Sequence, residues 1–299
     1  MTVLTHNLAL PGHYQRAELL AFHQRDAQQF AEQVNETTLA KGIFWDNTPA
    51  RLRIDFQHDQ AQAQLQIDSL QTVTSEQLQD WRLWLEYFLG LQQPITEFLQ
   101  AHQTHPELGP LLSRQAGLRV AQTSSPFEAV SWAIIGQQIS VAAALNIRRR
   151  FIELAGAQHS SGIWCYPNAQ RVAQLSIEQL RSAGLSQNKA RAIAQISQQL
   201  ASGQMRWPQQ ITDDNLGQLR TALLAIPGIG PWTVNYTLMR GFAWLDGSLH
   251  GDAAVRRYLQ ELLQAEQLTA QQTEQWLAQF SPWRALVAAH LWQSQGFSG

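Results

Sequence analysis

The sequence predicts an α+β fold, in which an N-terminal antiparallel sheet with helices is followed by two all-helical lobes. Three observations predict it. Apolar and polar residues alternate along residues 50–56 and 63–68, as they do in half-buried strands. After about residue 125, apolar residues recur with the spacing of amphipathic helices. Near the C-terminus, two helical segments flank the run Pro-Gly-Ile-Gly at 227–230, and a Gly-Asp loop follows at 251–252.

The N-terminal part is predicted to be a supporting domain that covers residues 1–112. Its two alternating runs, 50–56 and 63–68, are separated by the polar segment Gln57–Gln60, which favours a β-hairpin. A helix is predicted over residues 76–91, where apolar residues have helical spacing. The scattered histidines of this part lack the spacing of metal ligands; they are His13, His23 and His58.

The helical region is predicted to cover residues 113–299, and a low-charge passage at 101–125 leads into it. One long helix is expected from Pro126 to Ala155, with a polar interruption at Gly136-Gln137-Gln138. The basic run Arg148-Arg149-Arg150 is expected to form a solvated face of that helix. Further short helices are expected to divide this region into two lobes separated by a cleft.

A helix-hairpin-helix is predicted at about residues 213–242. Pro227 and Gly228 end the first helix, because proline cannot donate a hydrogen bond and glycine accepts a positive φ. Pro231 suits the first position of the second helix. The main-chain N–H groups between Gly228 and Gly230 lack side-chain cover, and the second helix points its positive N-terminal end the same way, so together they form an anion site. A nucleic-acid backbone is the expected ligand, and a purely structural helical hairpin is the alternative.

Asp252 lies 22 residues after Gly230, in the Gly-Asp loop, and directly precedes an apolar helical segment at 253–259. A carboxylate in that position can cap the helix by accepting main-chain N–H bonds. The alternative is a functional carboxylate beside the hairpin. Two more helices are expected after it, over 269–280 and 283–292.

Composition narrows the class of protein. The chain has 299 residues, of which 44% are hydrophobic and 15% charged, as in a soluble globular protein. A formal net charge of −2 argues against a protein that holds DNA by overall electrostatics, so DNA contacts should be local. The lone cysteine, Cys165, excludes an internal disulfide. The N-terminus has no basic segment followed by an apolar run, so we expect a cytoplasmic location.

Several blocks of the sequence resemble the helix-hairpin-helix DNA glycosylase superfamily, above all its AlkA-type 3-methyladenine DNA glycosylase II group. The blocks are Ala133–Ala142, Pro227–Tyr236, Pro282–Arg284 and Ala289–Trp292. Members of the superfamily share a loop aspartate at the place of Asp252. Relatives that resemble endonuclease III carry a cysteine-ligated iron–sulfur cluster after the last helix, and residues 291–299 contain no cysteine. We therefore expect no iron–sulfur cluster.

The resemblance implies four groups of site residues around a catalytic Asp252. The aromatic pocket for the damaged base is lined by Trp232, Tyr236 and Trp283. The DNA backbone is bound by Gly228, Ile229, Gly230 and Thr233. A monovalent cation, Na⁺ or K⁺, is held by the main-chain carbonyls of Leu224, Ile226 and Ile229. The duplex wedge is Gln138, where the group often has an apolar residue; a core helix with buried amides is the alternative.

The chemistry of base removal explains the aspartate. Breaking an N-glycosidic bond builds positive charge on the sugar, and the base must first leave the stack. At about 4 Å and an effective dielectric near 20, a carboxylate attracts that charge by roughly 4 kcal/mol, which corresponds to about a thousandfold in rate. Relatives that also cut the strand have a nucleophilic lysine two residues after the last hairpin glycine. Trp232 occupies that position here, which predicts hydrolysis of the base alone.

The sequence therefore predicts a monofunctional DNA repair glycosylase that flips and excises alkylated purines of the 3-methyladenine and 7-methylguanine class, leaving an abasic site. Its expected partner is double-stranded DNA with damaged bases, and we expect a monomer that requires no cofactor. Cation–π stacking on indole faces favours such positively charged bases. The alternatives are a glycosylase for oxidised or mismatched bases, a non-catalytic DNA-lesion binder, and a structural helical scaffold.

Overall fold

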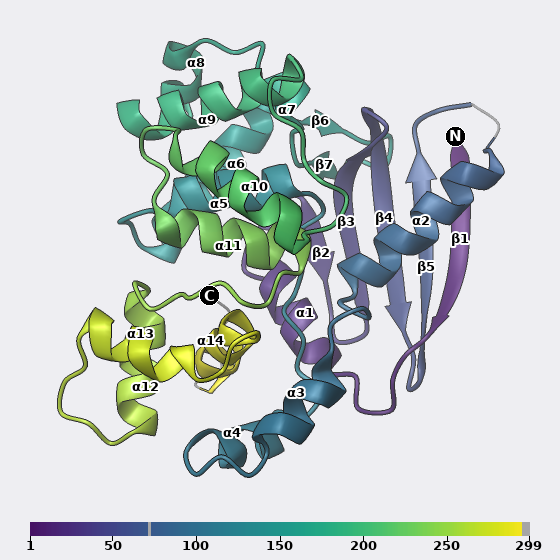
Figure 1. Ribbon diagram of the computed structural model, residues 1–299. Helices are drawn as coiled ribbons and strands as arrows, with labels where there is room; N and C mark the ends of the chain where they lie inside the picture. The colour runs from purple at the N-terminus through teal and green to yellow at the C-terminus, as the bar shows by residue number, and fades with distance from the viewer. Residues whose placement is uncertain (71–72, 295–299) are drawn as a thin grey trace.

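The computed structural model describes residues 1–70 and 73–294, and it confirms the α+β prediction (Figure 1). The last five residues of the predicted helical region lie outside the described chain. One sheet stands on one side of the molecule, and most of the helices form two groups on the other. No helix in the described part is long and apolar enough to cross a membrane.

The sheet is antiparallel over its main strands, with the order β1-β5-β4-β3-β7-β6, and β2 pairs with β3. Its strands are β1 Thr2–Ala9, β2 Glu32–Val34, β3 Thr38–Trp45, β4 Thr48–Phe56, β5 Gln60–Ile67, β6 Ala157–Gln158 and β7 Trp164–Cys165. The predicted hairpin is confirmed as β4 and β5, whose alternate residues are buried. Sequence alternation did not identify β1 or β3.

Two short strands from the helical region extend this sheet, which corrects the expectation of a purely N-terminal sheet. β7 lies parallel to β3, with Gly42 opposite Cys165. A Cβ atom on Gly42 would lie 2.1 Å from the main-chain oxygen of Trp164, so only glycine allows the two strands to approach this closely. The two parts of the chain therefore share one sheet.

The helices of the N-terminal half pack in different hydrophobic cores. They are α1 Arg16–His23, α2 Ser75–Phe88, α3 Ile95–His102 and α4 Leu108–Arg114. α2, predicted over 76–91, is confirmed and packs on the sheet through Trp81, Leu85 and Phe88. In contrast, α3 and α4 contribute to the core of the C-terminal lobe. The predicted division at residue 112 cuts through this packing, because α3 precedes it and α4 spans it.

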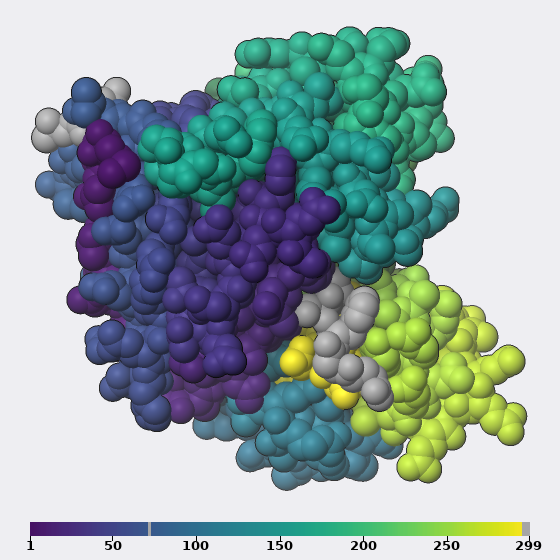
Figure 2. Space-filling model, turned by 180° about the vertical axis from the view of Figure 1, so that it is seen from behind, coloured from purple at the N-terminus to yellow at the C-terminus, as the bar shows by residue number. Residues whose placement is uncertain are grey.

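Two helical lobes share one central helix. The first lobe contains α5 Pro126–Gly136, α6 Val141–Ala155, α7 Ala169–Val172, α8 Ile177–Ser182, α9 Gln187–Ala201, α10 Asp213–Leu224 and α11 Pro231–Phe242. The second contains α12 Ala253–Leu262, α13 Ala270–Ala278 and α14 Arg284–Gln293, together with α3 and α4. Val234 and Leu238 of α11 pack in the first core, whereas Tyr236 and Met239 pack in the second. Seen from behind, the two lobes form separate masses against the sheet (Figure 2).

The single helix expected over 126–155 is wrong, because the chain forms two helices with a turn between them. α5 ends at Gly136, Gln138 takes a positive φ of 55°, and α6 begins at Val141. Ser140 caps α6 by accepting a bond from the main-chain N–H of Ala143. The polar interruption in the sequence is therefore a turn, and the alternative of buried amides in a core helix does not apply to Gln138, which is exposed.

Candidate active site

The predicted hairpin is present between α10 and α11. Gly228 has a φ of 92°, a conformation that favours glycine, and Gly230 is the N-cap of α11 with Pro231 at the first helical position. Pro227 and Gly228 are exposed, and a Cβ atom added to Gly230 would meet nothing within 4 Å. Ile229 is only 5% exposed, because its side chain packs in the first core. The hairpin thus offers main chain rather than side chains to an approaching strand.

The main-chain carbonyls proposed for a monovalent cation lie at the same hairpin. Within the described chain, no hydrogen bond reaches the carbonyl oxygens of Leu224 or Ile229, and that of Ile226 accepts one bond, from the N–H of Ile229, at 3.0 Å. Oxygen atoms with free lone pairs are the donors that an alkali cation takes. No group of three or more His, Cys, Asp or Glu side chains suited to a metal is present among the described residues.

Asp252 is held by four N–H donors. One carboxylate oxygen, Oδ1, accepts the main-chain N–H groups of Ala254 and Val255, both at 2.9 Å, so Asp252 caps α12. The same oxygen lies 3.4 Å from the indole Nε1 of Trp292, and Oδ2 accepts the indole N–H of Trp232 at 3.0 Å. The capping interpretation is therefore confirmed, and it places the carboxylate against two tryptophans.

All four donors to Asp252 are electrically neutral. None of the ion pairs in the described chain includes this residue. Neutral N–H groups stabilise an ionised carboxylate without cancelling its net charge. The side chain is half-buried, so one side of it remains accessible. Asp252 therefore keeps a negative charge that can act on a positive group beside it.

Trp232 and Tyr236 form a stacked aromatic wall next to this carboxylate. Their ring centroids lie 5.2 Å apart at an interplanar angle of 27°. Trp232 is half-buried, whereas Tyr236 is 3% exposed and backs it from the core. Trp283 instead contacts Phe98 and His102, with distances between ring centroids of 5.9 and 5.5 Å. The structure thus brings Trp232, Tyr236 and Asp252 together, and Trp283 contacts a different part of the same lobe.

Trp292 is a site residue that the sequence interpretation did not assign to the site. Forty residues separate it from Asp252, and its only signal was its place in a short block of family-like sequence. It is 3% exposed and packs in the second core through α14. No local periodicity predicts such a contact, because it depends on how α12 and α14 pack together.

Gln137 connects the turn that carries Gln138 to the hairpin. Its amide nitrogen donates to the carbonyl of Gly228 and to the hydroxyl of Thr233, both at 2.9 Å. The predicted role of Thr233 in binding the DNA backbone would not involve its side chain, since that residue is 2% exposed and its hydroxyl already accepts a bond from Gln137. Thr233 instead supports the turn from inside.

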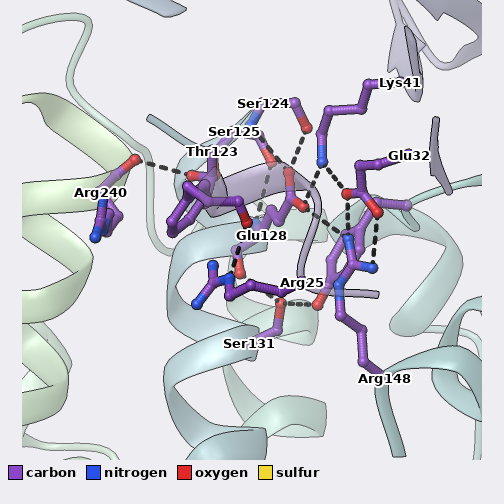
Figure 3. A network of polar contacts seen from close by, with 12 residues as sticks. Arg25, Glu32, Lys41, Thr123, Ser124, Ser125, Glu128, Ser131, Arg148 and Arg240 are labelled. Atoms are coloured by element: carbon purple, nitrogen blue, oxygen red, sulfur yellow. Dashed lines mark hydrogen bonds and ion pairs between the residues drawn. The ribbon is translucent and has the colours of Figure 1, made fainter. Parts of the chain in front are cut away.

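A buried ion cluster lies where β2 and β3 of the sheet meet α5 and α6 of the first lobe (Figure 3). It consists of Glu32, Lys41, Glu128 and Arg148. The expectation of a solvated basic run is wrong for Arg148, which is 6% exposed and bonded to both carboxylates. Burial alone would raise the pKa of Glu128, but Lys41 and Arg148 outweigh it and lower that pKa to about 2.

This region of the chain matches a known protein family. The HhH-GPD superfamily of base excision DNA repair proteins matches residues 131–282, just over half of the chain. The matched segment begins in α5, contains the hairpin and Asp252, and ends just before Trp283.

Among curated proteins, the chain is similar to the DNA-3-methyladenine glycosylase of Bacillus subtilis. The two are 30% identical over 160 residues, which is 52% of each chain. It is also 29% identical over 192 residues to DNA-3-methyladenine glycosylase 2 of Escherichia coli, which covers 64% of this chain and 65% of that protein. The similarity thus spans about half to two thirds of the length of these relatives.

Solved structures share the fold over nearly the whole chain. A 3-methyladenine DNA glycosylase from Archaeoglobus fulgidus superposes with a TM-score of 0.76 at 20% identity, covering 96% of this chain and 98% of that one. An 8-oxoguanine glycosylase/lyase from Clostridium acetobutylicum superposes with a TM-score of 0.71 at 13% identity, covering 96% and 95%. Because glycosylases with different named substrates share it, the fold alone does not select the base.

Proposed function

Because the chain belongs to the HhH-GPD superfamily of base excision DNA repair proteins, we propose that it is a DNA glycosylase that excises alkylated purines from duplex DNA. The observation that carries the proposal is Asp252, a carboxylate held only by neutral donors and placed against the indole of Trp232. The names of the curated relatives support the alkylated-base class.

In the proposed reaction, Asp252 acts on the sugar after the base has left the stack. The bond between C1′ and the base nitrogen breaks, and its electron pair leaves with the base. Asp252 stabilises the positive charge that develops on the sugar. A water oxygen then bonds to C1′ and its proton passes to Asp252 or to solvent, which leaves an abasic site. A base that already carries a positive alkylated ring departs neutral, so no protonating acid is needed.

We place the flipped base against the aromatic wall of Trp232 and Tyr236. An electron-rich indole face attracts an electron-poor, alkylated ring through cation–π stacking. Trp283 remains in the proposal as a wall of the same pocket on the side of the second lobe. Its present contacts with Phe98 and His102 would fix the orientation of its ring.

The hairpin is proposed to grip the DNA strand through its main chain. The exposed Gly228 and the uncrowded Gly230 leave N–H groups within reach of a phosphate. The carbonyls of Leu224, Ile226 and Ile229 would hold a monovalent cation, which supplies positive charge facing the phosphate when bound. Gln138, exposed at the tip of its turn, is proposed to fill the gap left by the flipped nucleotide.

We further propose that the enzyme removes the base without cutting the strand. Lyase chemistry needs an amine that attacks C1′ and forms a Schiff base. The indole of Trp232 occupies the corresponding position and donates its N–H to Asp252. An indole nitrogen has no available lone pair for such an attack.

The test is an excision assay with the purified protein on duplexes that each carry one modified base. We expect abasic sites at 3-methyladenine and 7-methylguanine, no strand break before alkali treatment, and no adduct trapped by borohydride. Preferred release of 8-oxoguanine or of a mismatched adenine would replace the alkylated-base assignment. Binding to damaged duplexes without release of any base would indicate a non-catalytic binder, and absence of binding at low salt would indicate a structural role.

A further inference from the structure

The loop between α11 and α12, which carries Asp252, crosses from the first lobe to the second (Figure 1). It is fastened at two places. In its first half, the carboxylate of Asp246 accepts two bonds from the guanidinium of Arg284 on α14, at 2.7 and 2.9 Å. Four residues before Asp252, the carbonyl of Ser248 accepts a bond from the side-chain amide of Asn235 on α11, at 2.7 Å. The second fastening lies closer along the chain to the carboxylate of the site.

The amide of Asn235 has a single possible orientation. This side chain is 4% exposed, and its Oδ1 accepts a bond from Nη1 of Arg220 on α10, at 2.8 Å. A guanidinium can only donate, and the carbonyl of Ser248 can only accept. The oxygen of the amide must therefore face Arg220, and its nitrogen must face the loop.

The loop also packs closely on α11 at this point. A Cβ atom on Gly247 would lie 3.0 Å from Cβ of Asn235, so glycine allows the loop to approach the helix this closely. On the other side, Leu249 is fully buried in the second core. The main-chain N–H of Asp252 donates to the carbonyl of Leu249 at 2.9 Å. A shift at Ser248 would therefore reach Asp252 through one tight turn.

We propose that Asn235, oriented by Arg220, is a positioning residue that fixes the place of the Asp252 carboxylate. The inference rests on the proposed function in taking Asp252 as the group that acts on the sugar. α10 and α11 are the two helices of the hairpin, so the element that would grip the DNA strand would also hold the catalytic loop. Misplacing a reacting group by about 1 Å can cost about a hundredfold in rate.

The first test is Asn235→Asp, which keeps the size of the side chain and an oxygen for Arg220. It replaces the donor to Ser248 by an oxygen, which repels the carbonyl. We expect single-turnover excision of 7-methylguanine to fall by at least about tenfold, because the loop moves away from α11. The melting temperature should stay close to that of the wild type, since the new carboxylate pairs with Arg220. A fall smaller than about twofold in the folded variant would overturn the proposal.

Asn168→Asp is the matched control. It also loses one amide donor, the bond to Asn47 at 2.8 Å, and it keeps the oxygen that caps α7 by accepting the N–H of Arg171. Excision by this variant should equal that of the wild type. A fall equal to that of Asn235→Asp would show that the loss at Asn235 has no connection with the loop.

A second pair of variants tests the orientation of the amide. Arg220→Met removes the donor to Oδ1, so the amide of Asn235 can rotate and its bond to Ser248 weakens; we expect excision to slow by about threefold. Arg220→Lys keeps one donor and should restore most of the rate. A wild-type rate in Arg220→Met, or no recovery in Arg220→Lys, would contradict the positioning role. This pair decides the proposal if Asn235→Asp does not fold.

A charged analogue distinguishes positioning from a change in charge. The wild-type protein should bind a duplex with a protonated pyrrolidine in place of the deoxyribose about a hundredfold more tightly than one with uncharged tetrahydrofuran. Asn235→Asp adds a negative charge, which by itself would raise this preference, whereas a displaced Asp252 lowers it. We expect a preference of about tenfold or less, with unchanged affinity for the uncharged duplex. A preference as large as the wild type's would contradict the proposal.

A readout without DNA separates this inference from the proposed function. In the full-length protein, amide hydrogen exchange over residues 246–252 should be at least about threefold faster in Asn235→Asp than in the wild type or in Asn168→Asp. If the wild-type protein excises nothing, the glycosylase proposal fails, but faster exchange would still show that Asn235 fixes the loop. If the wild type is active and exchange in Asn235→Asp is unchanged, the glycosylase proposal stands and the positioning role is overturned.

Discussion

Glu128 and Asp252 are two carboxylates with different kinds of partner: Glu128 pairs with cations, and Asp252 accepts bonds from neutral N–H groups. Glu128 is 4% exposed and ion-paired with Lys41 and Arg148, which neutralise it. Asp252 is half-buried and accepts bonds from two main-chain N–H groups and two indoles. The first carboxylate joins the sheet to a helical lobe, whereas the second caps the start of α12 at the edge of the proposed pocket.

The difference lies in the type of partner rather than in the number of bonds. A cation partner satisfies a carboxylate and also cancels its field, so little attraction remains for a third group. Neutral donors satisfy the oxygen atoms and leave the charge. The buried cluster is therefore suited to holding the molecule together, and Asp252 is suited to stabilising a short-lived positive charge.

The largest expected effect is on catalysis at Asp252. Asp252→Asn keeps an N-cap of similar quality and removes the charge, so we expect single-turnover excision of 7-methylguanine to fall by about a thousandfold. The melting temperature and the affinity for an uncharged abasic duplex should stay close to those of the wild type. Retained activity in this variant would show that another group stabilises the sugar.

The second effect is on stability at the buried cluster. Lys41→Met leaves Glu32 and Glu128 to share Arg148, so we expect a loss of about 3 kcal/mol in the free energy of unfolding, measured with urea. The matched control is Arg53→Met, which breaks the exposed pair with Asp55 and should cost less than about 1 kcal/mol. Equal losses in the two variants would remove the distinction between buried and exposed pairs.

A smaller effect on the rate of excision is expected when the indole donor of Trp232 to Asp252 is removed. Trp232→Phe keeps an aromatic wall but removes an N–H bond to a charged group, so single-turnover excision should slow by about tenfold. Trp276→Phe is the control, since Trp276 packs against Phe280 away from Asp252. If the two variants behave alike, the indole N–H has no part in holding the carboxylate.

The smallest expected effect is the pH dependence of stability at His23, which lines a small pocket beside the cluster. Burial, with a further contribution from Lys41, lowers the pKa of His23 to about 3. Between about pH 6.5 and 3 the unfolded chain binds a proton that the folded chain does not, so stability falls as the pH falls through this window. His23→Leu should flatten the fall in urea midpoint between about pH 6.5 and 5, whereas the exposed His58→Leu should not. A fall as steep as the wild type's in His23→Leu would exclude this origin.

Local sequence signals predicted the hairpin and the aspartate cap, and these are the parts of the site that depend on few neighbours. Pro227, Gly228 and Pro231 fix the ends of two helices through their own backbone preferences. Asp252 caps the helix that directly follows it. Short-range chemistry determines such features, so they can be recognised without a structure.

Features that depend on distant partners were not predicted. The buried Arg148 of α6 pairs with Glu32 of β2, which lies 116 residues earlier in the chain, and nothing in the basic run indicates this. The turn at Gln138 interrupts an apolar helical pattern without proline. The bond that ties this turn to the hairpin, from Gln137 to Gly228, spans 91 residues. Trp292 reaches Asp252 only through the packing of two helices. Periodicity describes one element at a time and carries no information about such contacts.

The central claim is that Asp252 keeps an uncancelled negative charge where a cationic sugar would lie. The most direct test compares the affinities of two duplexes, one with a protonated pyrrolidine in place of the deoxyribose and one with the uncharged tetrahydrofuran analogue. The wild-type protein should prefer the charged analogue by about a hundredfold, and Asp252→Asn should abolish that preference while still binding the uncharged duplex. A preference that persists in Asp252→Asn would contradict the claim.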